Sequence, residues 1–219
     1  TDSRRDRFIL GKGHAAAALY HCLHVAGLID KETLDGFGKD GGTLRHHPDR
    51  RPEWGIDFTT GSLGHGLSLA AGLGYGARLN GEDWRAVVLL SDGEMAEGMI
   101  WEAAMFAAHH HLDNLLAIVD CNKMQALGKT HEILDAEDLA QKWEAFGWGV
   151  QRIDGHDLQT IQATFGAFPF ETGKPSVIIA DTVKGKGVSF MEDDLLWHYR
   201  CPDDDEYEAA LKEIGSDEN

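Results

Sequence analysis

Two polar segments carry residue types that suit a divalent-cation site, and each follows an apolar run. Asp92 and Gly93 come just after residues 86–90 (AVVLL), and Asn122 comes just after residues 115–119 (LLAIV). Asp92 and Asn122 are 30 positions apart, about one helix plus one strand, so neighbouring parallel strands would bring them together. A carboxylate and an amide oxygen suit Mg²⁺ or Ca²⁺ carrying a diphosphate, and Gly93 lets a phosphate approach the backbone.

Histidine is frequent, with 12 residues in the chain. His14, His47 and His198 lie in polar loop segments, where an imidazole can donate hydrogen bonds and move protons near neutral pH. The run 109–111 is different, because successive helical positions point about 100° apart and cannot chelate one metal together. We assign that run to a helix surface or an interface.

The composition is that of a globular protein and excludes some classes of partner. The 219 residues fit one domain, with 42% hydrophobic and 26% charged residues. Lys and Arg total 20 against 37 Asp and Glu, a net charge of −17, which argues against nucleic acid or an anionic membrane as the partner. No apolar run approaches the roughly 20 residues that cross a bilayer, and no signal-peptide pattern opens the chain.

The cysteines indicate the compartment. Cys22, Cys121 and Cys201 are far apart and form no CxxC pair. This pattern indicates neither a disulfide framework nor a structural zinc site, so we expect a reducing cytoplasm as the setting.

Apolar and helical segments alternate in the second half of the chain. Four segments indicate buried parallel strands, of which the last is the weakest: 86–90, 115–119, 176–180 and 149–153. Helices are predicted over 98–111, over 136–146 with Asp135 as the cap, and over 158–168. This order predicts an α/β fold with an open, mostly parallel sheet and helices on both faces.

The two ends of the chain have other patterns. A helix is predicted over 15–26, after a short apolar run at 8–10, and a polar, Gly-rich loop over 36–54. A second helix has small residues at helical spacing, which permit close approach of a core element, a cofactor or another subunit: Gly66, Ala70, Gly74 and Ala77. Residues 1–202 are interpreted as one domain, and the acidic segment 203–219 as a solvated terminal helix with a frayed end.

The segment SDGEMAEGMIWEA…LDNLLAIVDCNKMQALG resembles the thiamine diphosphate signature in the form found in transketolases. Four further segments look like successive transketolase motifs in the same order: RDRFILGKGHAAAALY, HHPDR, TTGSLGHGLS and VKGKGVSFMEDDLLWH. The resemblance extends from Arg5 to about Pro202. It implies the thiamine diphosphate-binding fold, in the N-terminal domain that holds the cofactor's diphosphate.

The resemblance implies a role for each matching residue. The divalent ion would be held by Asp92, Asn122 and the carbonyl of Met124. The remaining cofactor contacts would come from the loops around them: Lys12, His14, Gly61, Leu63, Gly93, Glu94, Asn122, Lys184 and His198. Of these, Gly61 and Leu63 match backbone groups that meet the aminopyrimidine ring.

The resemblance also implies residues that act on the substrate. His47 matches a histidine that reaches the ketose donor. Glu97 and Glu102 match buried acids at the subunit interface, which relay the cofactor's protonation state. His14, His47, Glu97 and His198 are therefore the expected catalytic residues.

The chain departs from the family pattern in four ways. Ser91 stands where Gly is usual, and Cys121 stands where Asn is common. The family's upstream Ser-Gly-His segment has no counterpart. The chain also carries no pyrimidine-binding domain, which supplies the glutamate that activates the cofactor.

We therefore interpret the chain as resembling the N-terminal subunit of a split transketolase. Such a subunit would act on sugars or sugar phosphates with a separate C-terminal subunit, in an α2β2 heterotetramer.

Three alternatives remain at this point. Gly11-Lys12-Gly13-His14-Ala15-Ala16 partly fits the fingerprint of a nicotinamide-dependent oxidoreductase, although Lys12 and His14 are bulky for that turn. The chain could instead be a noncatalytic or regulatory subunit that has kept the fold. It could also be another thiamine diphosphate enzyme, similar to 1-deoxyxylulose-phosphate synthase.

Overall fold

The structure, a computed structural model, describes residue 2 and residues 4–216. Its main sheet has five parallel strands in the order β1-β2-β3-β7-β6. Their bounds are Arg7–Leu10 (β1), Ala86–Ser91 (β2), Leu115–Cys121 (β3), Gly149–Asp154 (β6) and Ser176–Asp181 (β7). A separate antiparallel pair joins Met124–Gln125 (β4) and Gly128–Lys129 (β5). All four predicted strands are present, and the short run at 8–10 adds an edge strand.

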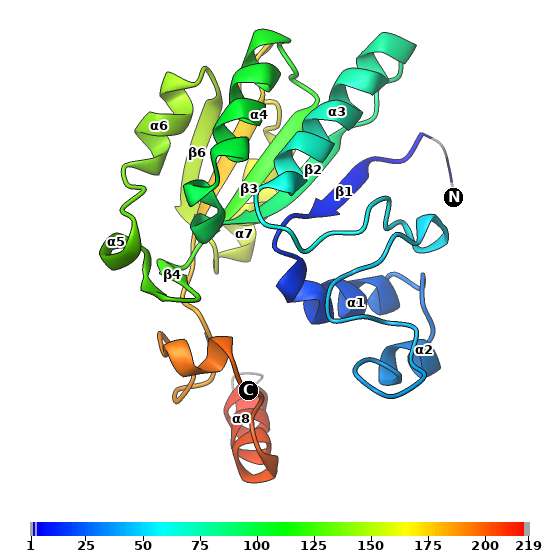
Figure 1. The fold of residues 1–219 in the computed structure, drawn as a ribbon, viewed down its shortest axis with the longest axis vertical. Coiled ribbons are helices and arrows are strands. Elements are labelled where there is room, and N and C mark those ends of the chain that lie inside the picture. Colours follow the sequence, from blue (N-terminus) through cyan, green and yellow to red (C-terminus); the bar gives the residue numbers. More distant parts are fainter. Residues whose placement is uncertain (1, 3, 217–219) are drawn as a thin grey trace.

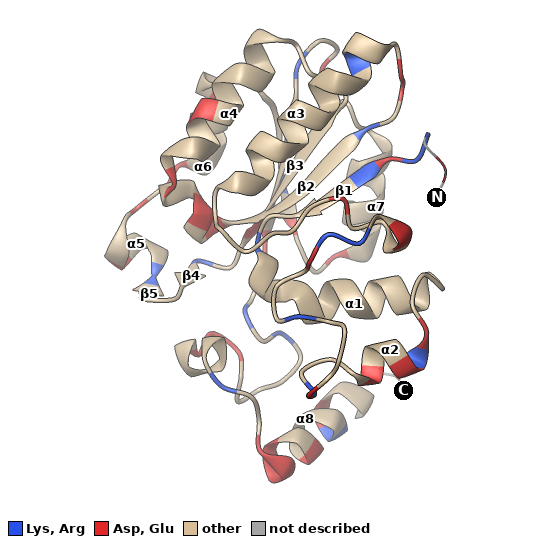
Figure 2. Cartoon of the chain, turned by 45° about the vertical axis from the view of Figure 1, so that its right-hand side comes forward, with Lys and Arg blue, Asp and Glu red and all other residues tan. Residues whose placement is uncertain are grey.

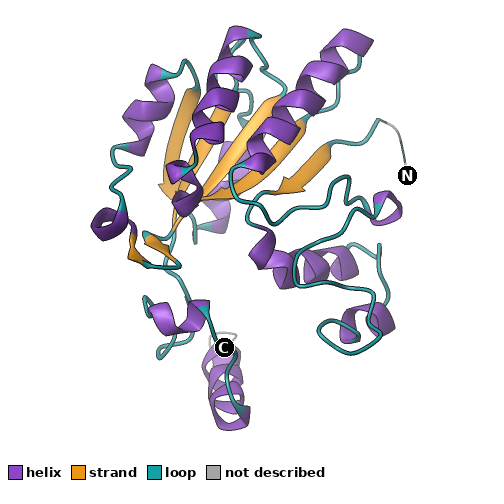
Figure 3. Ribbon diagram, in the orientation of Figure 1, coloured by secondary structure: helices purple, strands orange, loops and turns teal. Residues whose placement is uncertain are grey.

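Helices cover both faces of the sheet. Figure 1 shows α3, α4 and α6 over one face and α7 behind it, with α1 and α2 beyond the edge formed by β1. The bounds are Ala16–Val25 (α1), Lys31–Asp35 (α2), His65–Asn80 (α3), Gly98–His109 (α4), Thr130–Ile133 (α5), Leu139–Ala145 (α6), Leu158–Gly166 (α7) and Asp204–Ser216 (α8). The secondary structure in Figure 3 is thus the predicted open parallel α/β sheet.

The predicted helices are present, but their boundaries differ from the prediction by one to three residues, most of all at the start of α6. Helix α6 begins at Leu139, not at 136, since Asp138 accepts a hydrogen bond from the Ala140 N–H at 2.9 Å. Helix α4 ends at His109, before the last two residues of its predicted span. His109 and His111 are exposed, as expected of a helix surface, whereas His110 is half-buried against Tyr75 and Phe106.

The small residues of α3 face the sheet. Gly66, Ala70, Gly74 and Ala77 are all buried. A Cβ at Gly66 would lie 2.7 Å from the Gly11 Cα, and one at Gly74 would lie 3.3 Å from the Asn114 side chain. The stripe therefore allows close packing on β1 and β2, and the idea that it faces a cofactor or another subunit is wrong.

The acidic segment after Pro202 forms α8, as predicted. Asp204, Asp205 and Glu206 occupy its first turn, where carboxylates complement the helix dipole. Figure 2 shows these acidic residues gathered at the start of α8. Residues 217–219, part of the predicted frayed end, lie outside the described residues.

Among the residues that the structure describes, no helix is both long enough and apolar enough to cross a bilayer.

Candidate active site

The two predicted metal-binding segments meet at the carboxyl end of the sheet. Strands β2 and β3 are parallel neighbours, paired from Ala86↔Leu115 to Ser91↔Asp120. Asp92 and Asn122 follow these strands and therefore lie at the same edge of the sheet. The Lys123 N–H donates to the Asp92 carboxylate at 2.6 Å. The predicted juxtaposition of the two strand ends is confirmed.

The Asp92 carboxylate is buried at this edge, with 5% of the residue exposed. Burial raises the pKa of Asp92 to about 6, and the neighbouring Asp120 charge acts in the same direction. Hydrogen bonds from the Lys123 and Gly93 N–H groups oppose that shift. A divalent cation here would offset the cost of holding the ionised carboxylate away from water.

The turn after β3 supplies oxygen atoms beside Asp92. Asn122 is half-buried, and its side-chain oxygen accepts a hydrogen bond from the Met124 N–H at 3.0 Å. A cavity of about 330 Å³ opens beside this turn and is lined by Asn122, Lys123, Met124, Lys129, His131, Thr182, Val183 and Asp193. A carboxylate, an amide oxygen and a backbone carbonyl are a donor set that suits Mg²⁺ or Ca²⁺, so the residues present fit the predicted ion.

Two of the predicted phosphate-binding residues form a pair on one loop. The Lys184 ammonium lies 3.4 Å from the His198 Nδ1, and the His198 ring lies 5.6 Å from the His14 ring, between centroids. Partial burial lowers the pKa of both Lys184 and His198, and the nearby Lys12 charge lowers both further. The carboxylates of Asp120 and Asp92 offset these shifts only in part at Lys184, and a diphosphate would add further negative charge beside the cluster.

His14 stays neutral over a wide pH range. Desolvation by the surrounding protein, followed by the positive charges of Lys12, His198, Lys184 and His47, lowers the pKa of His14 to about 4, although the side chain is exposed on one side. A neutral ring can donate one hydrogen bond and accept another. The charges that act on His14 belong to four other predicted site residues, which therefore lie near it: Lys12, His47, Lys184 and His198.

Lys12 is buried and has a carboxylate partner that the sequence did not indicate. Lys12 is 8% exposed, and its ammonium forms an ion pair with Asp120 at the end of β3. The Thr182 hydroxyl donates to the other Asp120 oxygen at 2.5 Å. Burial opposes ionisation of Asp120, but the Lys12 charge and these hydrogen bonds outweigh it and lower its pKa.

One signal could have pointed to Asp120. It occupies a strand position that is otherwise apolar in β3, next to the predicted ligand segment. A carboxylate at such a position needs a buried partner.

The loop after β1 and the loop before α3 are in direct backbone contact. A Cβ at Gly13 would lie 2.8 Å from the Gly61 Cα, and one at Gly61 would lie 3.0 Å from the His47 ring. Leu63 is 36% exposed on the same loop. These contacts place Gly61 and His47 next to the His14 loop, which agrees with their predicted neighbourhood.

Glu94 connects this loop to the metal-binding segment. Its carboxylate is fully buried and accepts hydrogen bonds from the N–H groups of Gly64 at 3.0 Å and Ser91 at 2.8 Å. Burial raises the pKa of Glu94, and the two backbone donors lower it in part. With both oxygens occupied by protein groups, Glu94 is placed to hold the two loops together.

Glu97 and Glu102 lie on the outer side of α4. Glu97 is the residue before the first turn of the helix, and both side chains are exposed in this single chain. The structure does not bring them to Asp92 or the histidines. Their predicted burial at an interface requires a second chain.

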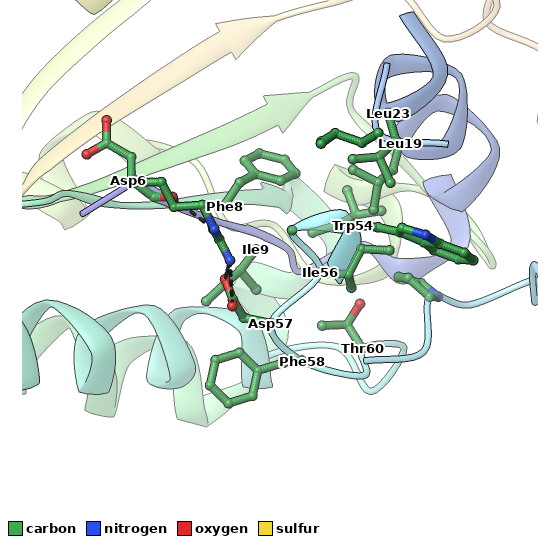
Figure 4. A pocket seen from close by; sticks show the side chains of 15 residues that line it. Asp6, Phe8, Ile9, Leu19, Leu23, Trp54, Ile56, Asp57, Phe58 and Thr60 are labelled. Carbon is green, nitrogen blue, oxygen red and sulfur yellow. Dashed lines mark hydrogen bonds and ion pairs between the residues drawn. The ribbon is translucent and has the colours of Figure 1, made fainter. Parts of the chain in front are cut away.

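A separate cavity is lined by none of these residues. It has a volume of about 200 Å³ and lies between β1, α1 and the segment 54–60. Figure 4 shows its lining, which is mostly apolar and includes Phe8, Leu19, Leu23, Trp54 and Ile56. Its charged residues already have partners: Arg5 pairs with Asp57 at 2.7 Å, and Asp6 pairs with Arg85 at 2.6 Å. This cavity has no converging groups for proton transfer or metal binding.

The chain matches a known protein family over nearly its whole length. Residues 2–219 match the family described as "Transketolase, thiamine diphosphate binding domain". The chain belongs to the transketolase family. The nicotinamide alternative is therefore excluded, and Lys12 within its proposed fingerprint is instead the buried partner of Asp120.

Two curated relatives are named as transketolase subunits. The chain is 41% identical over 213 residues to an apulose-4-phosphate transketolase subunit of Phocaeicola vulgatus, covering 97% of this chain and 75% of that protein. It is 44% identical over 210 residues to the 6-deoxy-6-sulfo-D-fructose transketolase subunit SqwG of Clostridium sp., covering 96% and 76%. These matches confirm the predicted resemblance to the N-terminal subunit of a split transketolase.

A solved transketolase has the same fold. The transketolase from Campylobacter jejuni superimposes with a TM-score of 0.87 at 30% identity, over 97% of this chain and 34% of that one. The chain thus spans about a third of that solved enzyme. The predicted thiamine diphosphate-binding fold is confirmed.

Proposed function

We propose that this chain is the N-terminal subunit of a thiamine diphosphate-dependent transketolase, which moves a two-carbon ketol unit from a ketose to an aldose acceptor. The observation that carries the proposal is the convergence of Asp92 and Asn122 at one sheet edge, beside a cluster of lysines and histidines. Anion-binding and cation-binding groups side by side match a metal diphosphate.

The strand-end residues would hold the metal and the diphosphate. Asp92, Asn122 and the Met124 carbonyl would bind Mg²⁺ or Ca²⁺, and Gly93 would contact the phosphate through its backbone. His14, Lys184 and His198 would donate hydrogen bonds to the phosphate oxygens. Lys12, held by Asp120, would keep a fixed positive charge nearby.

The loop residues would orient the substrate and move protons. Thiamine diphosphate supplies the electron sink when it is bound. Gly61 and Leu63 would meet its aminopyrimidine ring through backbone groups, and Glu94 would keep their loop in place. His47, with His14 and His198, would donate hydrogen bonds to the donor sugar and hold protons at ring nitrogens.

The active enzyme would need a second polypeptide. We propose a C-terminal transketolase subunit with the pyrimidine-binding domain, in an α2β2 heterotetramer in the cytoplasm. The unpaired state of Cys22, Cys121 and Cys201 suits a reducing compartment. Glu97 and Glu102, exposed on α4, would become buried at that interface as proton relays. Sugars or sugar phosphates are the proposed substrates, in keeping with the named relatives.

The test is calorimetric titration of the chain with thiamine diphosphate and Mg²⁺, followed by a ketol-transfer assay. The assay compares the isolated chain with the chain co-expressed with the product of its neighbouring reading frame. We expect cofactor binding by the chain and turnover only by the complex. Turnover by the isolated chain would refute the split enzyme. Cofactor binding without turnover by any complex would favour the noncatalytic alternative.

A further inference from the structure

Helix α8 is bonded to the loop that carries Lys184 and His198. The Glu213 carboxylate on α8 accepts two hydrogen bonds from Ser189 of that loop, one from the N–H at 2.5 Å and one from the hydroxyl at 2.9 Å. Both carboxylate oxygens are therefore used on one loop residue. Ala210, one turn earlier on the helix, is 8% exposed, so α8 also packs against the protein at this point.

A second connection joins the first turn of α8 to the other end of the loop. Glu206 forms an ion pair with Arg200, whose guanidinium lies 4.2 Å from the centre of the Trp197 ring. The Trp197 indole N–H donates to the Phe190 carbonyl at 2.9 Å. Trp197 is the residue before His198, so this chain of contacts leads directly to a site residue.

The loop itself is closed by internal hydrogen bonds. The Asp193 N–H donates to the Lys184 carbonyl at 2.9 Å, and the Gly187 N–H donates to the Glu192 carboxylate at 3.0 Å. The Lys184–His198 contact then joins the two ends of the segment at the site. A displacement of Ser189 or Trp197 would therefore move Lys184 and His198.

We propose that α8 positions this loop for the cofactor, with Glu213 and Glu206 as positioning residues that act through Ser189 and Arg200. The inference rests on the proposed function, because it assigns Lys184 and His198 to the diphosphate. Without α8, the loop would lose conformational entropy when the cofactor binds. With α8 bonded to it, that cost is met when the chain folds, and binding is tighter.

The test uses Glu213→Ala and Glu213→Gln, with Glu208→Ala as the matched control. Glu208 is exposed on the same helix, and its side chain forms no hydrogen bond or ion pair with residue 2 or residues 4–216. Glu213→Ala should weaken thiamine diphosphate binding with Mg²⁺ about tenfold, the change that about 1.4 kcal/mol produces. Glu213→Gln keeps one acceptor oxygen, so its loss should be smaller. Glu208→Ala should bind as the unaltered chain does.

Two further measurements separate positioning from general stability. Trypsin should cut the cofactor-free Glu213→Ala variant faster after Lys186, while its melting temperature stays within a few degrees of the control. In the assembled enzyme, the KM for thiamine diphosphate should rise, and saturating cofactor should restore kcat. Unchanged affinity and unchanged cleavage would overturn the proposal, and so would an equal loss in Glu208→Ala.

The trypsin experiment also keeps this inference separate from the proposed function. If the unaltered chain binds no thiamine diphosphate, the proposed function fails. Faster cleavage of the Glu213 variants would then still show that α8 orders the loop. Equal cleavage of all variants would reject the inference even if the cofactor binds.

Discussion

At the scale of single residues, the buried carboxylate of Asp92, a proposed metal ligand, lowers the stability of the cofactor-free chain. Its raised pKa means that the folded chain binds a proton more tightly than the unfolded chain between about pH 4 and pH 6. Stability of the cofactor-free chain therefore falls as pH rises through this window, and the full cost is present at pH 7. A residue that lowers stability in the empty site is typical of a ligand-binding position.

Asp92→Asn should separate these two effects. It removes the buried titrating charge, so the free energy of unfolding of the cofactor-free variant, measured with urea, should not fall between about pH 4 and pH 6 as it does in the unaltered chain. Mg²⁺-dependent cofactor affinity should instead fall by orders of magnitude. In the unaltered chain, lowering the pH from about 7.5 to about 5 should weaken binding about tenfold through protonation of Asp92, and the variant should lack this part of the pH dependence. An equal pH slope in both proteins would contradict the assignment.

The Lys12–Asp120 pair should behave as a buried ion pair. Asp120→Asn leaves the Lys12 ammonium buried without its counter-charge, and we expect a loss of about 3 kcal/mol in the free energy of unfolding. The double variant Lys12→Met with Asp120→Asn should recover much of that loss. The exposed pair Lys31–Asp35 is the control, since solvent screens its charges and Asp35→Asn should cost far less stability than Asp120→Asn. Equal losses at the two pairs would refute the buried-pair interpretation.

At the scale of elements, the packing of α3 on the sheet supports the loop that carries Lys12 and His14. Gly66→Ala places a methyl group 2.7 Å from the Gly11 backbone, so one of the two segments must move. We expect a loss of about 2 kcal/mol in stability and weaker cofactor binding. Gly72→Ala, on the same helix and with open space around it, should instead stabilise the chain by about 0.5–1 kcal/mol. Thermal unfolding of both variants checks this contrast.

At the scale of the whole molecule, the outer side of α4 should be the surface that binds the partner subunit. Met105 is 53% exposed there, beside Glu102 and Phe106. Met105→Lys should leave the isolated chain folded but prevent its assembly with the co-expressed partner, as measured by mass in solution. Leu158→Lys is the matched control, because Leu158 is 78% exposed on α7, on the opposite face of the sheet. Loss of assembly in the control, or full assembly of the Met105 variant, would place the interface elsewhere.

Apolar runs and their spacing were sufficient to predict the sheet and one edge of the candidate site. Buried parallel strands are continuous apolar runs, and neighbouring parallel strands end at the same edge of the sheet. The sequence alone therefore predicted that Asp92 and Asn122 lie close together, and the pairing of β2 with β3 confirms it. The Lys12–Asp120 pair, which joins residues 108 positions apart, and the bond from Ser189 to Glu213 became visible only in the folded chain. Folding also turned the small-residue stripe of α3 toward the sheet. The physical reason is that residue periodicity encodes only local geometry, whereas these contacts depend on how separate elements pack in three dimensions.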